Sequence, residues 1–139
     1  MIDIEYVKKT FPEVIKYIPV TFNLTIGALL IAIPFALLFS LILNKKVPVL
    51  TQIIKTYISL IRGTPLLLQI YIMYNRGPLI LNGLVKALGL NLDVYAIDYI
   101  WYAYFVLSLS ATVSLTDAFK SAIVAVDKGQ FEAAYSVGL

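Results

Sequence analysis

The run YIPVTFNLTIGALLIAIPFALLFSLIL, residues 17–43, decides the fold class of this chain because it carries no charged side chain. An α-helix needs about 20 mostly apolar residues to cross the hydrocarbon core of a bilayer, so this run is long enough to cross with some tilt. Pro34 lies within it, but a neighbouring helix in a bundle can satisfy the carbonyl that a proline leaves free. We therefore predict a first membrane span over residues 19–44.

Composition extends this conclusion to the whole chain. Of the 139 residues, 60% are hydrophobic and 14% charged, and the mean hydropathy is +0.88. A soluble domain has roughly 45–50% apolar and about 25% charged residues, so the expected fold class is an all-α integral membrane protein. The lack of cysteine and histidine excludes disulfides, thiol nucleophiles, imidazole bases and the usual zinc sites, and we expect no metal site. A net charge of +3 is too small and dispersed to indicate nucleic-acid binding.

Basic residues set the expected orientation. Lys45, Lys46, Lys55 and Arg62 all follow the first span. Loops rich in lysine and arginine remain on the cytoplasmic side, so residues 44–52 should be cytoplasmic and the N-terminus outside the cell. Residues 1–18 have apolar side chains at helical spacing, which predicts an external interfacial helix lying on the lipid bilayer.

A second span is predicted over residues 53–75, with a kink. Pro65 cannot donate to the carbonyl of Ile61, and Gly63 adds backbone freedom, so the helix should bend there. Arg62 and Gln69 would share a helical face, which allows two interpretations. Arg62 either extends to the cytoplasmic interface, or it faces a polar cavity that lines a substrate pathway.

Residues 77–97 carry charges and are too short for a span, so they predict an external loop and helix that Gly89 can end. An uncharged run from Tyr99 to Thr116 predicts a third span over residues 99–119. Polar side chains follow one face of that span: Ser110, Ser114 and Asp117. They either line the pathway or form interhelical hydrogen bonds, and Asp117 could pair with Lys120 one turn on.

The last stretch, KGQFEAAYSVGL at residues 128–139, differs from the spans. Its apolar residues fall on one helical face, and small residues would let another backbone approach closely. Such a helix is too short to cross a bilayer and too weak to stand alone in water. We interpret it as a docking helix, and the alternative is an interfacial turn without a partner.

Three blocks of this sequence resemble one family. Glu132-Ala133-Ala134, followed by Gly138, is similar to the EAA motif of the permease subunits of bacterial ATP-binding-cassette (ABC) importers. The run RGTPLLLQ at residues 62–69 resembles the RGTPLLVQ signature of the polar amino-acid branch. TFNLT at residues 21–25 resembles the start of that branch's first helix. The chain departs from the family at Ser114, Asp117 and Lys120, where tyrosine, glutamate and arginine are usual.

The resemblance implies the N-terminal part of a type I ABC importer permease with three spans. Residues 127–139 would begin the cytoplasmic loop that docks on a separate ATPase. All of residues 120–139 would lie inside the cell. The coupling residues implied are Gly129, Phe131, Glu132, Ala133, Ala134 and Gly138. Further partners implied are a second permease subunit and an extracytoplasmic solute-binding protein in the bacterial cytoplasmic membrane.

The sequence holds no P-loop and no catalytic group of residues, so we do not expect this chain to be an enzyme. We expect ATP and magnesium to bind to the partner ATPase. The family's later I-x-L-P element and C-terminal spans are absent from this sequence. We therefore expect either a fragment or a truncated, non-transporting permease. The alternative from another class is a structural or regulatory membrane protein whose last helix lies on the bilayer.

Overall fold

The structure, a computed structural model, describes residues 4–126, 129–130, 135–136 and 138. This part of the chain is helical and without strands, which confirms the all-α prediction. Its elements are α1 (Ile4–Lys16), α2 (Ile18–Lys45), α3 (Pro48–Gly63), α4 (Leu66–Ala87), the 3₁₀-helix η1 (Val94–Ala96) and α5 (Ile100–Ala125).

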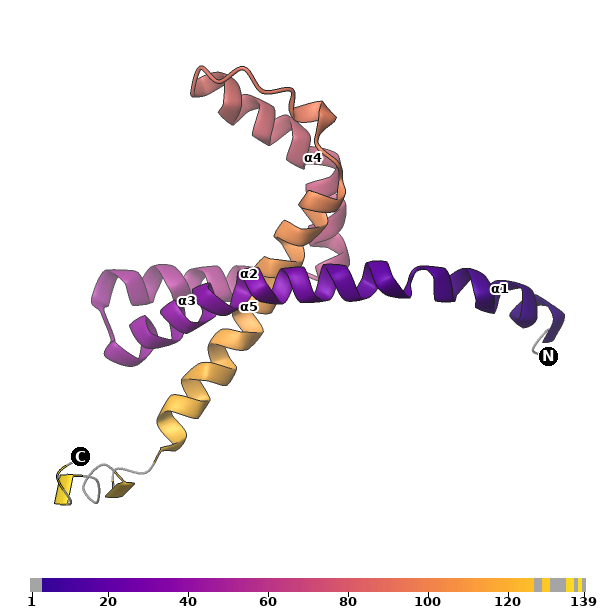
Figure 1. Cartoon of the computed structure of the whole chain (residues 1–139). Helices are drawn as coiled ribbons and strands as arrows, with labels where there is room; N and C mark the ends of the chain where they lie inside the picture. Colours follow the sequence, from indigo (N-terminus) through magenta and orange to yellow (C-terminus); the bar gives the residue numbers. More distant parts are fainter. Residues whose placement is uncertain (1–3, 127–128, 131–134, 137, 139) are drawn as a thin grey trace.

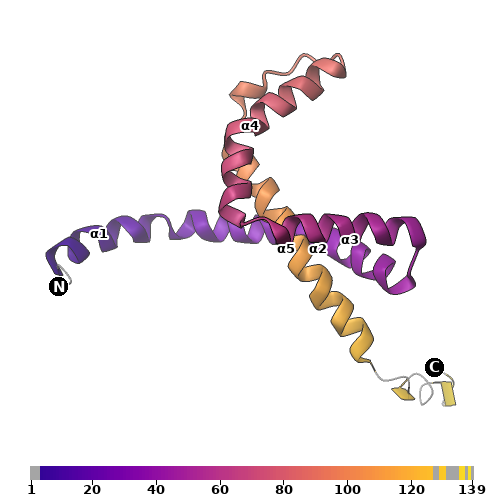
Figure 2. The ribbon, with the colours of Figure 1, turned by 180° about the vertical axis from the view of Figure 1, so that it is seen from behind.

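The helices form an open arrangement organised by one crossing (Figure 1). Helices α1 and α2 follow each other as one long rod, and α3 folds back beside the final part of α2. Helix α5 runs alongside α4, then crosses α2 and continues beyond it. The view from behind shows the same crossing, with the two ends of the chain far apart (Figure 2).

A stripe of small residues lets α2 and α5 pack closely. Four small side chains recur at every fourth position of α2 and are nearly or fully buried: Ala28, Ala32, Ala36 and Ser40. This spacing places them on one face, where a partner backbone can approach closely. Helix α5 is the element packed along this face. The small-residue stripe is therefore the centre of the fold.

The buried face of α5 carries hydroxyls that are satisfied within their own helix. Ser108, Thr112 and Thr116 donate to the carbonyls of Tyr104, Ser108 and Thr112 at 2.6, 2.7 and 2.6 Å. A buried hydroxyl without a partner costs free energy, and these bonds remove that cost. The face therefore stays compact without presenting unsatisfied polar atoms to α2.

A second contact joins α2 and α5 at the other end of their crossing. A Cβ atom added to Gly27 would collide with the ring of Tyr104, so the ring lies directly against the α2 backbone. The Tyr104 hydroxyl donates to Oδ1 of Asn23, one turn earlier on α2. Glycine at position 27 is therefore needed for this close approach.

The predicted first span is confirmed as a helix. Helix α2 is, within the described residues, the one helix long and apolar enough to cross a membrane. Helix α5 begins close to the predicted third span and ends at Ala125 rather than at 119. With 26 residues it is about 39 Å long. Helix α1 is confirmed over Ile4–Lys16 with none of its residues buried, and its place at a membrane surface stays a prediction.

The prediction of one kinked helix over residues 53–75 is wrong. Helix α3 ends at Gly63, Thr64 is extended with φ −116° and ψ 130°, and α4 starts after Pro65. A proline restricts the residue before it to extended conformations and supplies no N–H to the preceding turn. Gly63 and Pro65 therefore mark a break between two helices rather than a kink in one.

The predicted boundary between a second span and a separate segment over residues 77–97 is also wrong, because α4 runs across it. The helix predicted within that segment is present, and its position outside the membrane stays a prediction. Residues 77–87 complete α4, which bends along its length in Figure 1 and contains Pro78. Gly77 is buried, and a Cβ atom there would lie 2.8 Å from Sδ of Met73 and 2.9 Å from the ring of Tyr102, so α4 and α5 pack closely at this point. The predicted end is confirmed: Gly89 has φ +67°, and Leu90 N–H donates to the Val85 carbonyl at 3.0 Å.

We predict that Ala36→Leu destabilises the protein by about 1–3 kcal/mol, because added methylenes force packed helices apart. Ala36 is fully buried in the stripe. The free energy of unfolding in mixed micelles, from a denaturing-detergent titration, is the measurement. The matched control is Ala118→Leu at an exposed position of α5, which should change this value little. Equal losses for the two variants would contradict the close packing of α2 and α5.

Candidate functional site

An ion pair joins the end of α3 to α5. The guanidinium of Arg62 contacts the carboxylate of Asp117, and the two side chains are 53% and 47% exposed. Asp117 thus pairs with Arg62 on another helix and not, as the sequence suggested, with Lys120 on its own helix. In water a pair this exposed contributes about 0–1 kcal/mol, whereas within a bilayer an unpaired charge is costly. The contact brings together two residues that the sequence assigned to the pathway.

A hollow of about 360 Å³ lies beside this ion pair. We call it the basic hollow and define it by its lining residues: Leu43, Lys55, Ile58, Ser59, Arg62, Asp117 and Lys120. It carries three cationic side chains and one anionic side chain, from α3 and α5. Asp117 and Lys120 also line an adjoining open hollow of about 570 Å³ with Ser121. The region around the ion pair is therefore polar and open.

The serines predicted on the pathway lie outside this region. Ser110 is half-buried and Ser114 is exposed, on the turns of α5 that precede Asp117. Neither lines the basic hollow or the adjoining one. Their place on a pathway stays a prediction.

Gln69 lies at the break between α3 and α4 and replaces a missing backbone donor. The carbonyl of Ile61 would accept from residue 65 in a continuous helix, but Pro65 has no N–H. The side-chain amide of Gln69 donates to this carbonyl at 2.9 Å and to the Thr64 carbonyl at 2.9 Å. The predicted helical face shared by Arg62 and Gln69 is wrong, because the break separates them. Gln69 instead caps the end of α3.

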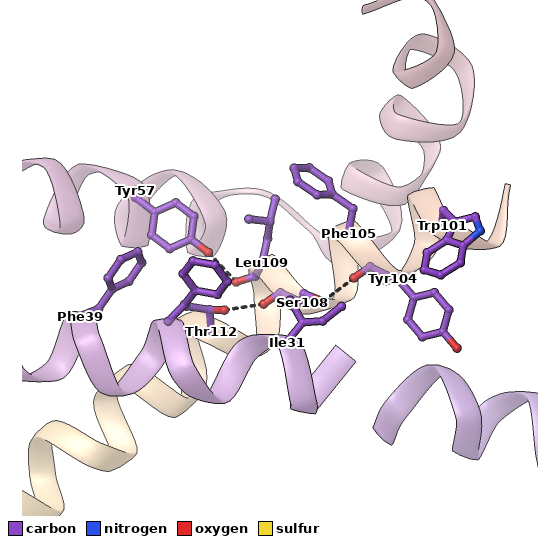
Figure 3. A pocket seen from close by; sticks show the side chains of 10 residues that line it. Ile31, Phe39, Tyr57, Trp101, Tyr104, Phe105, Ser108, Leu109 and Thr112 are labelled. Atoms are coloured by element: carbon purple, nitrogen blue, oxygen red, sulfur yellow. Dashed lines mark hydrogen bonds between the residues drawn. The ribbon is translucent and has the colours of Figure 1, made fainter. Parts of the chain in front are cut away.

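Aromatic side chains surround a third hollow, of about 530 Å³, between α2, α3 and α5 (Figure 3). The hydroxyl of Tyr57 donates to the Leu109 carbonyl at 2.8 Å. The Tyr57 ring meets Phe39 of α2 edge-on, with centroids 5.7 Å apart. Sequence reasoning missed Tyr57, because nothing near it in the sequence identifies a partner 52 residues away. Tyr57 therefore links all three helices.

Part of the predicted coupling segment lies outside the described residues, including Phe131, Glu132, Ala133 and Ala134. Gly129 and Gly138 are described and exposed. Gly138 has φ +80°, a conformation that glycine adopts at little cost, and its N–H donates to the Tyr135 carbonyl at 3.2 Å. In the described part of the chain, no three Asp, Glu, His or Cys side chains are grouped where they could hold a metal ion.

Known proteins resemble this chain over nearly its whole length. It is 35% identical over 138 residues to "Probable amino-acid permease protein YxeN" of Bacillus subtilis, covering 99% of this chain and 57% of that protein. It is 31% identical to the B. subtilis "L-cystine transport system permease protein TcyL", covering 99% and 55%. A crystal structure of an amino acid ABC transporter with histidines superposes with a TM-score of 0.69 at 27% identity, covering 100% of this chain and 59% of that one.

The chain is a homologue of amino-acid ABC transporter permeases. The resemblance inferred from the EAA-like and RGTP-like blocks is thereby confirmed. No protein-family model matches the chain. This permease homologue spans about half the length of the curated relatives it matches.

We predict that Gln69→Leu destabilises the permease homologue by about 1 kcal/mol, because it removes the amide that donates to the Ile61 and Thr64 carbonyls and leaves Ile61 only the longer bond from the Thr64 hydroxyl, at 3.3 Å. Pro65→Ala restores a backbone N–H at that position, so the loss should shrink in a Pro65→Ala background. Unfolding free energies of the two single variants and the double variant measure this coupling. Gln52→Leu, at an exposed position of α3, is the matched control. Additive losses would show that Gln69 does not replace the proline's missing donor.

A double-mutant cycle tests the ion pair. Arg62→Leu and Asp117→Asn should show a coupling of about 0.5–1 kcal/mol in detergent, because each removes the other's partner. The unfolding free energy is the measurement. Arg62→Leu combined with Asp98→Asn, at an acid in the loop before α5, should be additive. A zero coupling between positions 62 and 117 would contradict a stabilising role for the ion pair.

Proposed function

We propose that this protein acts as the membrane subunit of an ATP-driven importer for polar amino acids or related solutes. The observation that carries the proposal is the 35% identity, over 138 residues, with a probable amino-acid permease. A further relative is named an L-cystine transport permease, and the structural neighbour is an amino acid ABC transporter. The apolar helix α2 supports a place in the bacterial cytoplasmic membrane.

The proposed path through the membrane has three crossings. The N-terminus and residues 1–18 lie outside, α2 passes inward, and residues 44–52 are cytoplasmic, as the basic residues there favour. The broken pair α3 and α4 carries the chain outward. Helix α5 returns it, with residues 120–139 inside. Its length of about 39 Å is sufficient for this return.

The proposed transport pathway passes the Arg62–Asp117 ion pair. Charged groups within membrane segments are rare and usually face a cavity or a partner, and both residues line the basic hollow. Ser110 and Ser114 add hydroxyls on the turns of α5 before Asp117. Gln69 contributes by holding the α3–α4 break that places Arg62 against α5.

Coupling to the energy source is proposed to occur through residues 127–139. A separate ATPase subunit, which binds ATP and magnesium, would contact Phe131, Glu132, Ala133, Ala134 and the flanking Gly129 and Gly138. A second permease subunit and an extracytoplasmic solute-binding protein complete the assembly. Transport would follow alternating opening of the pathway to the two sides of the membrane, driven by closure of the ATPase subunits.

Reconstitution tests this function. The protein is placed in liposomes with its ATPase, partner permease and binding protein, and ATP-dependent uptake of radiolabelled amino acids is measured. We expect uptake from the unaltered protein. Glu132→Lys should reduce both uptake and ATPase co-purification at least tenfold, because it reverses a charge at the proposed contact.

The matched control is Lys9→Glu, a charge reversal on the exposed helix α1, which should retain ATPase binding. An assembled complex that hydrolyses ATP without uptake of any amino acid would refute the importer assignment. Normal ATPase binding by Glu132→Lys would refute the coupling assignment alone.

A further inference from the structure

The Arg62–Asp117 ion pair is accessible enough to exchange its partners. Its two side chains are 53% and 47% exposed, so small solutes can reach both charged groups. Ion pairs this exposed contribute little to stability, because water screens the two charges from each other. A solute that offers the same charges can therefore replace either partner at small cost.

The basic hollow gives such a solute room beside the ion pair. Its volume of about 360 Å³ is near the lower end of the range for small-molecule sites, which is roughly 300–1,000 Å³. Arg62 and Asp117 both line it, and Ser59 adds a hydroxyl. Lys55 and Lys120 also border it, and their positive charge attracts anionic groups towards it. The hollow therefore suits a compact, charged solute.

The two charges of the ion pair restrict which solute can replace it. An anion bound to Arg62 would deprive Asp117 of the partner that it has in the structure, and a cation bound to Asp117 would do the same to Arg62. Within a membrane segment a charge without its partner is costly. A solute with one positive and one negative group supplies a new partner to both residues. The carboxylate and ammonium groups on the α-carbon of an amino acid meet this requirement.

We propose that the Arg62–Asp117 ion pair recognises the zwitterionic head of an amino-acid substrate. The substrate's carboxylate takes the place of Asp117 on the Arg62 guanidinium, which can bind a carboxylate through two parallel N–H···O bonds. The substrate's ammonium group binds the carboxylate of Asp117, so the substrate bridges α3 and α5. This inference rests on the proposed function, because an importer of amino acids supplies the ligand.

Glycine tests this recognition without any transport measurement, because it carries the zwitterionic head and no side chain. The chain has two arginines, Arg62 and Arg76, so ¹⁵N-arginine labelling of the protein in nanodiscs gives guanidinium NMR signals from these two residues alone. We expect millimolar glycine to shift the Arg62 signal and to leave that of Arg76, on α4, unchanged. Acetate and methylammonium each carry half of the head and should bind about tenfold more weakly, since each leaves one residue of the ion pair without a partner.

Asp117→Asn keeps the size of the side chain and removes the charge that the ammonium group needs. In this variant acetate should shift the Arg62 signal at least as readily as glycine does. The matched control is Asp98→Asn in the loop before α5, which keeps the oxygen that accepts from the Ile100 N–H at 2.9 Å and should preserve the preference for glycine. Circular dichroism confirms that both variants remain helical.

Three outcomes would overturn the proposal: no shift of the Arg62 signal by glycine, equal shifts by glycine and acetate in the unaltered protein, or a preference for glycine that survives Asp117→Asn. Uptake of amino acids by a protein that shows any of these outcomes would refute this site and leave the importer assignment standing. Glycine binding at Arg62 without uptake of any amino acid would count against the importer and not against this site.

Discussion

The close approach of α2 and α5 is the constraint on which the rest of the structure depends. Lipid tails are as apolar as leucine, so membrane helices gain little from burying large side chains against each other and rely on close packing. The small-residue stripe of α2 and the internally bonded hydroxyls of α5 provide that packing. Helices α3 and α4 contact α5 in turn, so the crossing also positions the two other long segments.

The break at Thr64-Pro65 is the second determinant. It ends α3 where Arg62 meets Asp117, and it lets α4 leave α3 and run beside α5. The proline leaves the Ile61 carbonyl without a backbone donor, and the Gln69 amide supplies one. A single sequence block, RGTPLLLQ, thus contains the charge, the helix break and the side chain that stabilises it.

The long apolar helix and the helix at residues 100–125 could be predicted, because hydropathy and length depend on the local sequence. The helix break at Pro65 was anticipated as a kink, since sequence identifies the missing N–H but not whether packing keeps both sides collinear. The helix ending before Gly89 was predicted, but its continuity with the preceding residues of α4 was not, because the packing of Gly77 on Tyr102 of α5 joins segments distant in the sequence. The Arg62–Asp117 and Tyr57–Leu109 contacts join distant segments, so the spacing of residues in the sequence could not predict them. A local signal was missed: small residues recur at every fourth position of α2, at Ala28, Ala32, Ala36 and Ser40.

Thiol cross-linking in the bilayer tests the α2–α5 crossing most directly, because the natural chain has no cysteine. Gly27→Cys and Tyr104→Cys are introduced together, and the membrane-embedded protein is treated with a short bifunctional thiol reagent. The structure predicts an intramolecular cross-link, since the Tyr104 ring lies against Gly27. The pair Lys9→Cys and Tyr104→Cys should remain unlinked. Failure of the first pair to link, or equal linking of both pairs, would contradict the crossing.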